Sequence, residues 1–348
     1  MLGRGTKVFI SEEDTYGVMR ETHFTDGISA SSASYDDMIP FYNIPGSRPS
    51  WQQNTVRKNL MVGSNRRHVD MSSPSIGEVS GSYSIGISSD IGFKKMLYLA
   101  LGNTPVNNPG TIVPQVDVKS MTVIQTIEDG NKNLVTQFLG MCIDTMSISV
   151  SGLDSPITAD FSFLGQRENY LTTTDDSDIV NFFDTSKFTA PFNDVYPTWT
   201  TKLELGASSS DKTEVNFYDL NFSIGNSLSF ENYREGASNK FYHSNKPIPK
   251  TREVSGTFTL VGSTGDTTKE DNLITLLNNL KQNNVNYVKI WIYNDKLNKN
   301  YTIEFPKVYF ISGGVFDNLD FGELKLPLGF IAEGSASEHE VTIKVNDS

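Results

Sequence analysis

Apolar and polar residues alternate over many short segments of the chain. In residues 146–151, Met146, Ile148 and Val150 would share one face of a strand, and three serines would occupy the other face. The same alternation occurs in residues 83–87, 157–163, 220–224, 288–292 and 324–330. Because Gly, Asn, Asp and Ser bound these segments, the pattern predicts half-buried antiparallel strands and a mainly β fold.

Two segments instead have the spacing of a helix. Residues 91–101 place Met96, Leu97 and Leu101 near one face, with Asp90 as the expected N-cap and Gly102 as the expected C′ residue. Residues 270–281 gather four leucines in the same way, at positions 273, 276, 277 and 280. Each predicted helix follows a predicted strand that begins with the same four residues.

These four residues indicate an internal repeat. The sequence Glu-Val-Ser-Gly begins at Glu78 and again at Glu253, and each copy continues in the order polar, aromatic, polar, aliphatic. Four predicted strands follow the helix in each half. They cover residues 121–127, 133–139, 143–151 and 157–164 in the first half, and 286–293, 301–305, 307–312 and 322–331 in the second. We therefore predict a first module with an N-terminal arm and a connecting segment in residues 1–185, and a second module in residues 186–348. The polar residues 171–190 would form the connection.

A long polar excursion precedes the shared residues in each half. The excursions cover residues 43–75 and 231–252, and both are rich in Gly, Ser, Asn and basic residues. Loops of this length in a compact domain are usually functional or disordered, and their matching places favour a function. The basic residues of the two excursions include Arg57, Lys58, Arg66, Arg67, Arg234, Lys240 and Lys246.

Composition and net charge exclude several classes of protein. The 348 residues suggest about two domains, and 37% of them are hydrophobic. The formal net charge of -12 argues against a nucleic-acid binder, which would need Lys and Arg to neutralise phosphates. The most apolar stretch, residues 96–101, is too short to cross a bilayer, and the start of the chain lacks the apolar core of a signal peptide. We expect the protein to be made and kept in the cytosol.

The sequence offers no clear catalytic or metal-binding pattern. Cys142 is the single cysteine and is expected to be a small buried hydrophobic residue, since it can form neither an intrachain disulfide nor a zinc site. The four histidines are scattered, and no G-x-S-x-G motif is present. The run Asp175-Asp176-Ser-Asp178 lacks the closing Glu of a calcium loop. We expect no enzymatic activity, cofactor or metal. Because carboxylates are plentiful, the sequence does not exclude a glycosidase that uses two of them.

Three parts of the chain together resemble a known family. They are the opening residues 5–17, the first Glu-Val-Ser-Gly before its strand and helix, and residues 221–231 before the second Glu-Val-Ser-Gly. In this order they resemble a bacteriophage tail tube protein of the long-tailed phage type, with two tube modules in one chain. The resemblance implies a small β-sandwich or barrel with one flanking helix for each module. It also implies that three chains form a six-fold-like ring and that the rings stack around a lumen.

The resemblance further implies the location and partners of the protein. It would be a virion protein of the tail, assembled in the host cytoplasm, and it would conduct DNA into the host without binding it specifically. Its partners would be its own copies, a tape measure protein, a tail terminator and tail-tip or baseplate proteins, with no membrane contact. The excursions would reach the adjacent ring. The residues expected at contacts between rings or between subunits are Arg57, Lys58, Arg66, Arg67, Arg234, Lys240 and Lys246. Open sheet edges agree with this interpretation, because such edges need a partner chain.

Two other interpretations stay open. A non-viral β-sandwich for binding or adhesion could use Trp51, Trp199 and Trp291 as a platform for sugars. A baseplate or injection-machine tube component would share the fold of a tail tube protein.

Overall fold

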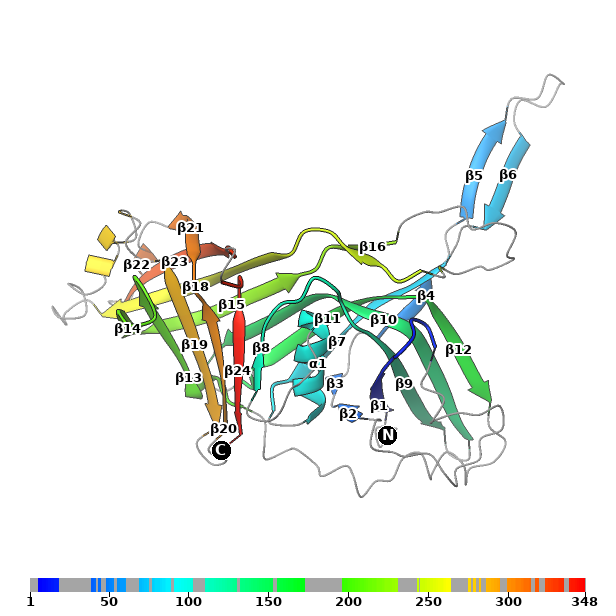
Figure 1. Cartoon of the computed structure of the whole chain (residues 1–348), viewed down its shortest axis with the longest axis horizontal. Coiled ribbons are helices and arrows are strands. Elements are labelled where there is room, and N and C mark those ends of the chain that lie inside the picture. Colours follow the sequence, from blue (N-terminus) through cyan, green and yellow to red (C-terminus); the bar gives the residue numbers. More distant parts are fainter. Residues whose placement is uncertain are drawn as a thin grey trace.

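Most of the described chain is antiparallel β-sheet, which confirms the mainly β prediction (Figure 1). This computed structural model describes residues 6–18, 39–41, 43–44, 48–52, 55–60, 69–74, 77–88, 91–102, 110–129, 132–152, 155–172, 196–230, 243, 245–263, 275–276, 278–279, 282, 286–294, 299–313, 317–318, 323–334 and 338–347. The proposed module boundary at residue 185 and most of the connecting segment lie outside these residues.

One sheet extends through both halves, and we call it the long sheet. In its first half, β3 (Asn43–Ile44) and β4 (Ser50–Gln52) pair with β7 (Glu78–Gly86), which pairs with β11 (Thr158–Gly165) and then β10 (Lys132–Ser151). The second half continues from β10 through β15 (Phe217–Gly225), β18 (Glu253–Ser263) and β23 (Glu323–Ala332) to β21 (Val308–Gly313). The short β22 (Asp317–Asn318) also pairs with β23.

Two further layers cover the apolar face of the long sheet. The first covering sheet has the order β2 (Ile39–Phe41), β1 (Thr6–Glu12), β9 (Ser120–Asp129), β10 and β12 (Arg167–Thr172). The second has the order β14 (Lys212–Val215), β13 (Thr201–Gly206), β19 (Tyr287–Asn294), β20 (Lys299–Phe305), β24 (Thr342–Asp347) and β8 (Gly110–Ile112). A short 3-10 helix, Thr198–Thr200, leads into β13.

Strand β10 belongs to two sheets, which corrects the prediction of separate strands at 133–139 and 143–151. Its first part pairs with β9 and β12, and its last part pairs with β11 and β15. The register shifts between Phe138 and Met141, where Gly140 has a φ of +67°, a conformation that costs little only for glycine. The chain therefore bends from one layer into the other without a break in hydrogen bonding.

Aromatic side chains fill the space between the layers. On the second half, the ring of Phe305 lies 5.5 Å from that of Phe222 and 5.3 Å from that of Phe330. On the first half, Tyr83 is fully buried and donates a hydrogen bond to Gln125 Oε1 at 3.3 Å. The alternation of apolar and polar residues in the sequence thus has its expected cause, because each strand of the long sheet buries one face.

The predicted helix at 91–101 is confirmed as α1 (Ile91–Leu101), followed by Gly102 with a φ of +80°. It contacts β10, β2 and β8. Figure 1 shows it between the first-half strands β1 and β2 and the second-half strand β24. Of the predicted helix at 270–281, residues 275–276 and 278–279 are helical and the others lie outside the described residues.

The two halves use their strands in the same order. In the long sheet, β4-β7-β11-β10 of the first half corresponds to β15-β18-β23-β21 of the second. In the covering sheets, β2-β1-β9-β10-β12 corresponds to β14-β13-β19-β20-β24. The order along the chain agrees as well. Even a β-bulge recurs, since the register shifts between Ile143 and Thr145 in β10 and between Phe310 and Ser312 in β21.

Two hairpins occupy the excursions predicted from the sequence. Strands β5 (Thr55–Leu60) and β6 (Val69–Pro74) pair with each other and project away from the sheets (Figure 1). Strands β16 (Leu228–Ser229) and β17 (Ile248–Pro249) form the base of the second excursion. The first excursion therefore contains a β-hairpin, whereas among the described residues of the second only Ile248–Pro249 form a strand.

Candidate functional site

The long sheet presents a polar face on the side opposite its core. Serine and threonine occupy this face in alternation with buried apolar residues. The residues are Ser80, Ser82, Ser84, Ser147, Ser149, Ser162, Ser223, Ser255, Thr257 and Thr259, and none of them is buried. A shallow hollow of about 540 Å³ opens on this face across β10, β15, β18 and β23. The face is thus a broad, hydroxyl-rich and slightly concave surface that extends across both halves.

The described charges on this face are mostly negative. Asp160 lies on β11, Asp219 lies near the start of β15, and Glu78 and Glu253 lie at the start of β7 and β18. Lys325 is also on this face, but its ammonium group lies 3.6 Å from the centre of the Tyr218 ring. Carboxylates and hydroxyl groups at these positions give a hydrophilic surface that repels other anions.

The long sheet has an open edge at each end, formed by β21 at one end and by β3 and β4 at the other. Within the described residues, β21 pairs with β23 alone, and β3 and β4 pair with β7 alone. Strand β21 exposes 45% of Tyr309 and 63% of Ile311. An edge with unpaired backbone groups and exposed apolar side chains is a site for pairing with another chain.

The two halves of the chain meet where the edge of β10 pairs with β15, and we call this contact the seam. Thr145 lies opposite Gly225 there, and Ser151 lies opposite Asp219. The buried Asn226 follows β15 and donates from Nδ2 to the carbonyl oxygens of Ala100 and Ile143, both at 2.9 Å. Its Oδ1 accepts a hydrogen bond from Arg252 Nε at 3.0 Å. Asn226 thereby joins α1, β10 and the second half of the chain.

The segment that follows β7 also crosses the seam. Phe93 of α1 packs edge-on against Tyr301 of β20, with ring centres 5.3 Å apart. The hydroxyl of Tyr301 donates to the carbonyl oxygen of Ser88 at 2.8 Å, and β8 pairs with β24, with Ile112 opposite Ile343. The first half therefore contributes the edge of β10, α1 and β8 to this contact.

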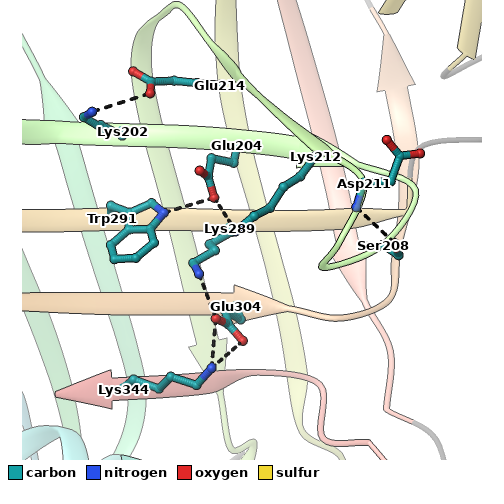
Figure 2. Close-up of polar contacts among 10 residues, drawn as sticks. All are labelled: Lys202, Glu204, Ser208, Asp211, Lys212, Glu214, Lys289, Trp291, Glu304 and Lys344. Atoms are coloured by element: carbon teal, nitrogen blue, oxygen red, sulfur yellow. Dashed lines mark hydrogen bonds and ion pairs between the residues drawn. The ribbon is translucent and has the colours of Figure 1, made fainter. Parts of the chain in front are cut away.

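A chain of ion pairs lies across the second covering sheet (Figure 2). Glu204 Oε2 lies 2.7 Å from Lys212 Nζ and accepts a hydrogen bond from Trp291 Nε1 at 3.0 Å. Glu304 pairs with Lys289 at 3.1 Å and with Lys344 at 3.0 Å. Burial alone would raise the pKa of both carboxyl groups. The bonds from Lys212 and Trp291 outweigh it at Glu204, and those from Lys344 and Lys289 outweigh it at Glu304, so both pKa values are lowered. The network ties β14, β13, β19, β20 and β24 together.

Glu13 differs from these carboxylates, because it is buried. It accepts hydrogen bonds from Gly17 N at 2.8 Å, Thr122 Oγ1 at 2.8 Å and Gly140 N at 2.9 Å. Burial raises its pKa, against the opposite effect of these bonds. Glu13 thus fixes the bend of β10 to the N-terminal strand.

The predicted contact residues fall in different places. Arg57 and Lys58 lie on β5 in the projecting hairpin, while Arg66, Arg67, Arg234 and Lys240 lie outside the described residues. Lys246 pairs with Asp117 of the same chain at 2.7 Å, which joins the second excursion to the segment after α1. The sequence analysis missed both Asn226 and Glu13. The Gly-Asn pair at the end of β15 was a signal for Asn226, because such pairs are typical of special backbone positions in turns.

Two of the remaining candidate groups, Cys142 and Trp291, have structural surroundings. Cys142 is fully buried, as predicted, and burial raises its pKa. Trp291 bonds to Glu204, and Trp199 is 62% exposed. In the part of the chain that the structure describes, no group of His, Cys, Asp and Glu side chains is arranged to hold a metal ion. No helix among the described elements combines the length and apolar character needed to span a membrane.

Comparison with known proteins places this fold in a family. The family model described as phage tail tube protein matches residues 3–276. A search of curated proteins gave no match. Among solved structures, the chain is similar to the SPP1 tail tube, with 12% identity, a TM-score of 0.27, and coverage of 52% of this chain and 84% of that one. It is also similar to the tube-terminating cap of the anti-feeding prophage, with 13% identity, a TM-score of 0.28, and coverage of 48% and 88%. Because the family model covers most of the sequence, the chain belongs to the phage tail tube protein family, a family of structural proteins of the virion tail.

Proposed function

We propose that this protein is the subunit of the tail tube itself and that it assembles with its own copies into stacked rings. The rings would form the conduit for DNA delivery into the host bacterium. Family membership and the long sheet with two open edges support this proposal. A sheet with open edges at both ends can continue from one copy to the next, and a closed ring leaves no edge exposed.

We further propose that the chain carries two tube modules, so that three chains form one ring with approximate six-fold symmetry. The observation that carries this point is the common strand order of the two halves, including the matching bulges in β10 and β21. The boundary between the modules would lie near residue 185, in the segment between β12 and residue 196.

The polar face of the long sheet would line the lumen. Its serine and threonine residues are not buried, so their hydroxyls would bind water, and Asp160, Asp219, Glu78 and Glu253 would repel the phosphates of DNA. Such a wall lets a polyanion slide, whereas a wall rich in Lys and Arg would bind it. The protein would therefore act as a conduit and not as an enzyme.

The projecting β5–β6 hairpin would contact the adjacent ring. It carries Arg57 and Lys58 and lies apart from the sheets (Figure 1). Tape measure, terminator and tail-tip or baseplate proteins would complete the tail at the lumen and at the two ends.

Electron microscopy of the purified protein, together with mass measurement in solution, tests the proposal. We expect rings or stacked tubes with a central channel, and a smallest closed species of three chains. A protein that stays monomeric at all concentrations and does not enter particles would contradict the proposal. A closed species of six chains would leave the tube subunit in place but would contradict the two-module interpretation.

A further inference from the structure

We infer that β21 of one copy pairs antiparallel with β4 of a second copy, with Ser312 opposite Gln52. This inference rests on the proposed function and specifies the partner of each open edge. It follows from the seam between the halves, where one chain already shows how two such units meet. The contact between copies would repeat the β10–β15 pairing, and β10 and β21 would have the same role.

The first step is that β21 occupies the position of β10. In the first half, Phe163 of β11 lies opposite Gly81 of β7 on one side and opposite Ile143 of β10 on the other. In the second half, Phe330 of β23 lies opposite Gly256 and Phe310 in the same way. The bulge then follows in both strands. Counting from it, Ser312 corresponds to Thr145, and Gly313 corresponds to Met146.

The second step is that β4 occupies the position of β15. Ser50, Trp51 and Gln52 lie opposite Ser80, Val79 and Glu78 of β7. Ser223, Ile224 and Gly225 lie opposite Ser255, Val254 and Glu253 of β18. The shared Glu-Val-Ser-Gly residues thus fix the correspondence, with Gln52 in the place of Gly225 and Trp51 in the place of Ile224.

The third step transfers the known register. Within the chain, Thr145 lies opposite Gly225 and Met146 lies opposite Ile224. The corresponding pairs between copies are Ser312 with Gln52 and Gly313 with Trp51. Because the two partner edges lie at opposite ends of the long sheet, each copy offers one edge to the next copy. Such a head-to-tail contact closes into a ring when the rotation allows it.

An independent observation supports the same orientation of the second copy. At the seam, β8 covers the edge of β24 and Ile343 is 1% exposed. In the first half, β12 corresponds to β24, and Tyr170 corresponds to Ile343. Tyr170 is 62% exposed, and within the described residues β12 pairs with β10 alone. A second copy would cover Tyr170, as β8 covers Ile343 within the chain.

Oxidative cross-linking of paired cysteines tests this register. We expect the Ser312→Cys, Gln52→Cys double variant to form covalent trimers on a non-reducing gel, because directly opposite strand residues are close enough for a disulfide. Buried Cys142 has a raised pKa and does not interfere. An equal mixture of the two single variants should form covalent dimers and nothing larger.

Two control variants test whether the cross-link depends on the proposed register. The Thr145→Cys, Gly225→Cys variant has the same register within one chain and should close its disulfide while remaining a monomer on the gel. The Tyr309→Cys, Gln52→Cys variant is displaced by three residues along β21, about 10 Å, and should not cross-link.

Electron microscopy of the same samples separates the inference from the proposed function. Rings with covalent trimers support both. Rings without cross-links, when the intrachain control closes, overturn the β21–β4 pairing and leave the tube subunit in place. Absence of both rings and cross-links overturns the proposed function together with the inference.

Discussion

Strands β10 and β21 have corresponding neighbours on one side, β11 and β23, but differ on the other side. Each has a bulge at the same position opposite a phenylalanine, Phe163 or Phe330. The far edge of β10 is closed by β15 and by the bonds of Asn226, whereas β21 exposes Ile311. The corresponding edge is thus closed by a second strand in β10 and open in β21. The β10–β15 pairing within the chain shows which kind of strand can close it.

The core behind the open edge should give the largest effect on folding. Phe330 is fully buried between Phe305 and Phe258, and its ring fills the space that a Cβ on Gly256 would occupy. We expect Phe330→Ala to lower the free energy of unfolding by about 3–5 kcal/mol. Chemical denaturation measures this loss. The control Thr257→Ala changes an exposed residue and should stay within about 0.5 kcal/mol of the unmodified protein. Similar losses in both variants would contradict the assigned packing.

The closed seam should give the next largest effect. Asn226→Ala leaves two buried carbonyl oxygens and the Arg252 guanidinium without their amide partner. We expect a loss of about 1–3 kcal/mol in the free energy of unfolding, measured by denaturation. Asn221 is a matched control, since its amide makes an exposed bond to Ser149 Oγ. If Asn221→Ala costs as much as Asn226→Ala, the seam is not held in the way described.

The ion pairs of the second covering sheet should make stability depend on pH. The pKa values of Glu204 and Glu304 are lowered in the folded state, so their contribution is present above the ordinary value of 4.5 and is lost as the pH falls through the folded values. Glu13 has a raised pKa and acts in the opposite direction. We expect Glu304→Gln to flatten the fall in melting temperature below pH 4.5. An unchanged pH profile would show that the network does not stabilise the fold.

The open edge should give the smallest effect on folding and a large effect on assembly. We expect Ile311→Lys to change the free energy of unfolding by no more than about 0.5 kcal/mol, because Ile311 is 63% exposed in the single chain. The same change should prevent ring formation, since Ile311 corresponds to Asp144, which is half-buried at the closed seam, and a lysine ammonium group there would lose its hydration between the copies. Denaturation and size-exclusion chromatography measure the two effects. Normal rings from this variant would show that β21 is not the contact edge.

The sequence predicted the strands well because one face of each is buried. Alternation identified β7, β11, β15, β19 and β23, and helical spacing identified α1. Period and propensity act locally, so these elements can be read without knowing their neighbours. The repeated Glu-Val-Ser-Gly residues also marked corresponding strands, because each glycine lies opposite a phenylalanine in the sheet.

The sequence could not predict which strands pair across the halves. The single course of β10 through two sheets depends on the bulge near Gly140, and the seam depends on Asn226, which contacts residues far away in the chain. Such contacts follow from tertiary packing and leave no local period. The basic residues proposed for contacts were chosen by composition and position, which could not show that Lys246 pairs with Asp117 of its own chain.

A map of the assembled tube by electron cryo-microscopy tests the central claim most directly, because it shows the number of chains in a ring and the pairing of every edge. The account predicts three chains per ring, with Ser312 of β21 opposite Gln52 of β4 in the next chain. A ring of six chains, or a ring in which β21 and β4 face solvent, would contradict it.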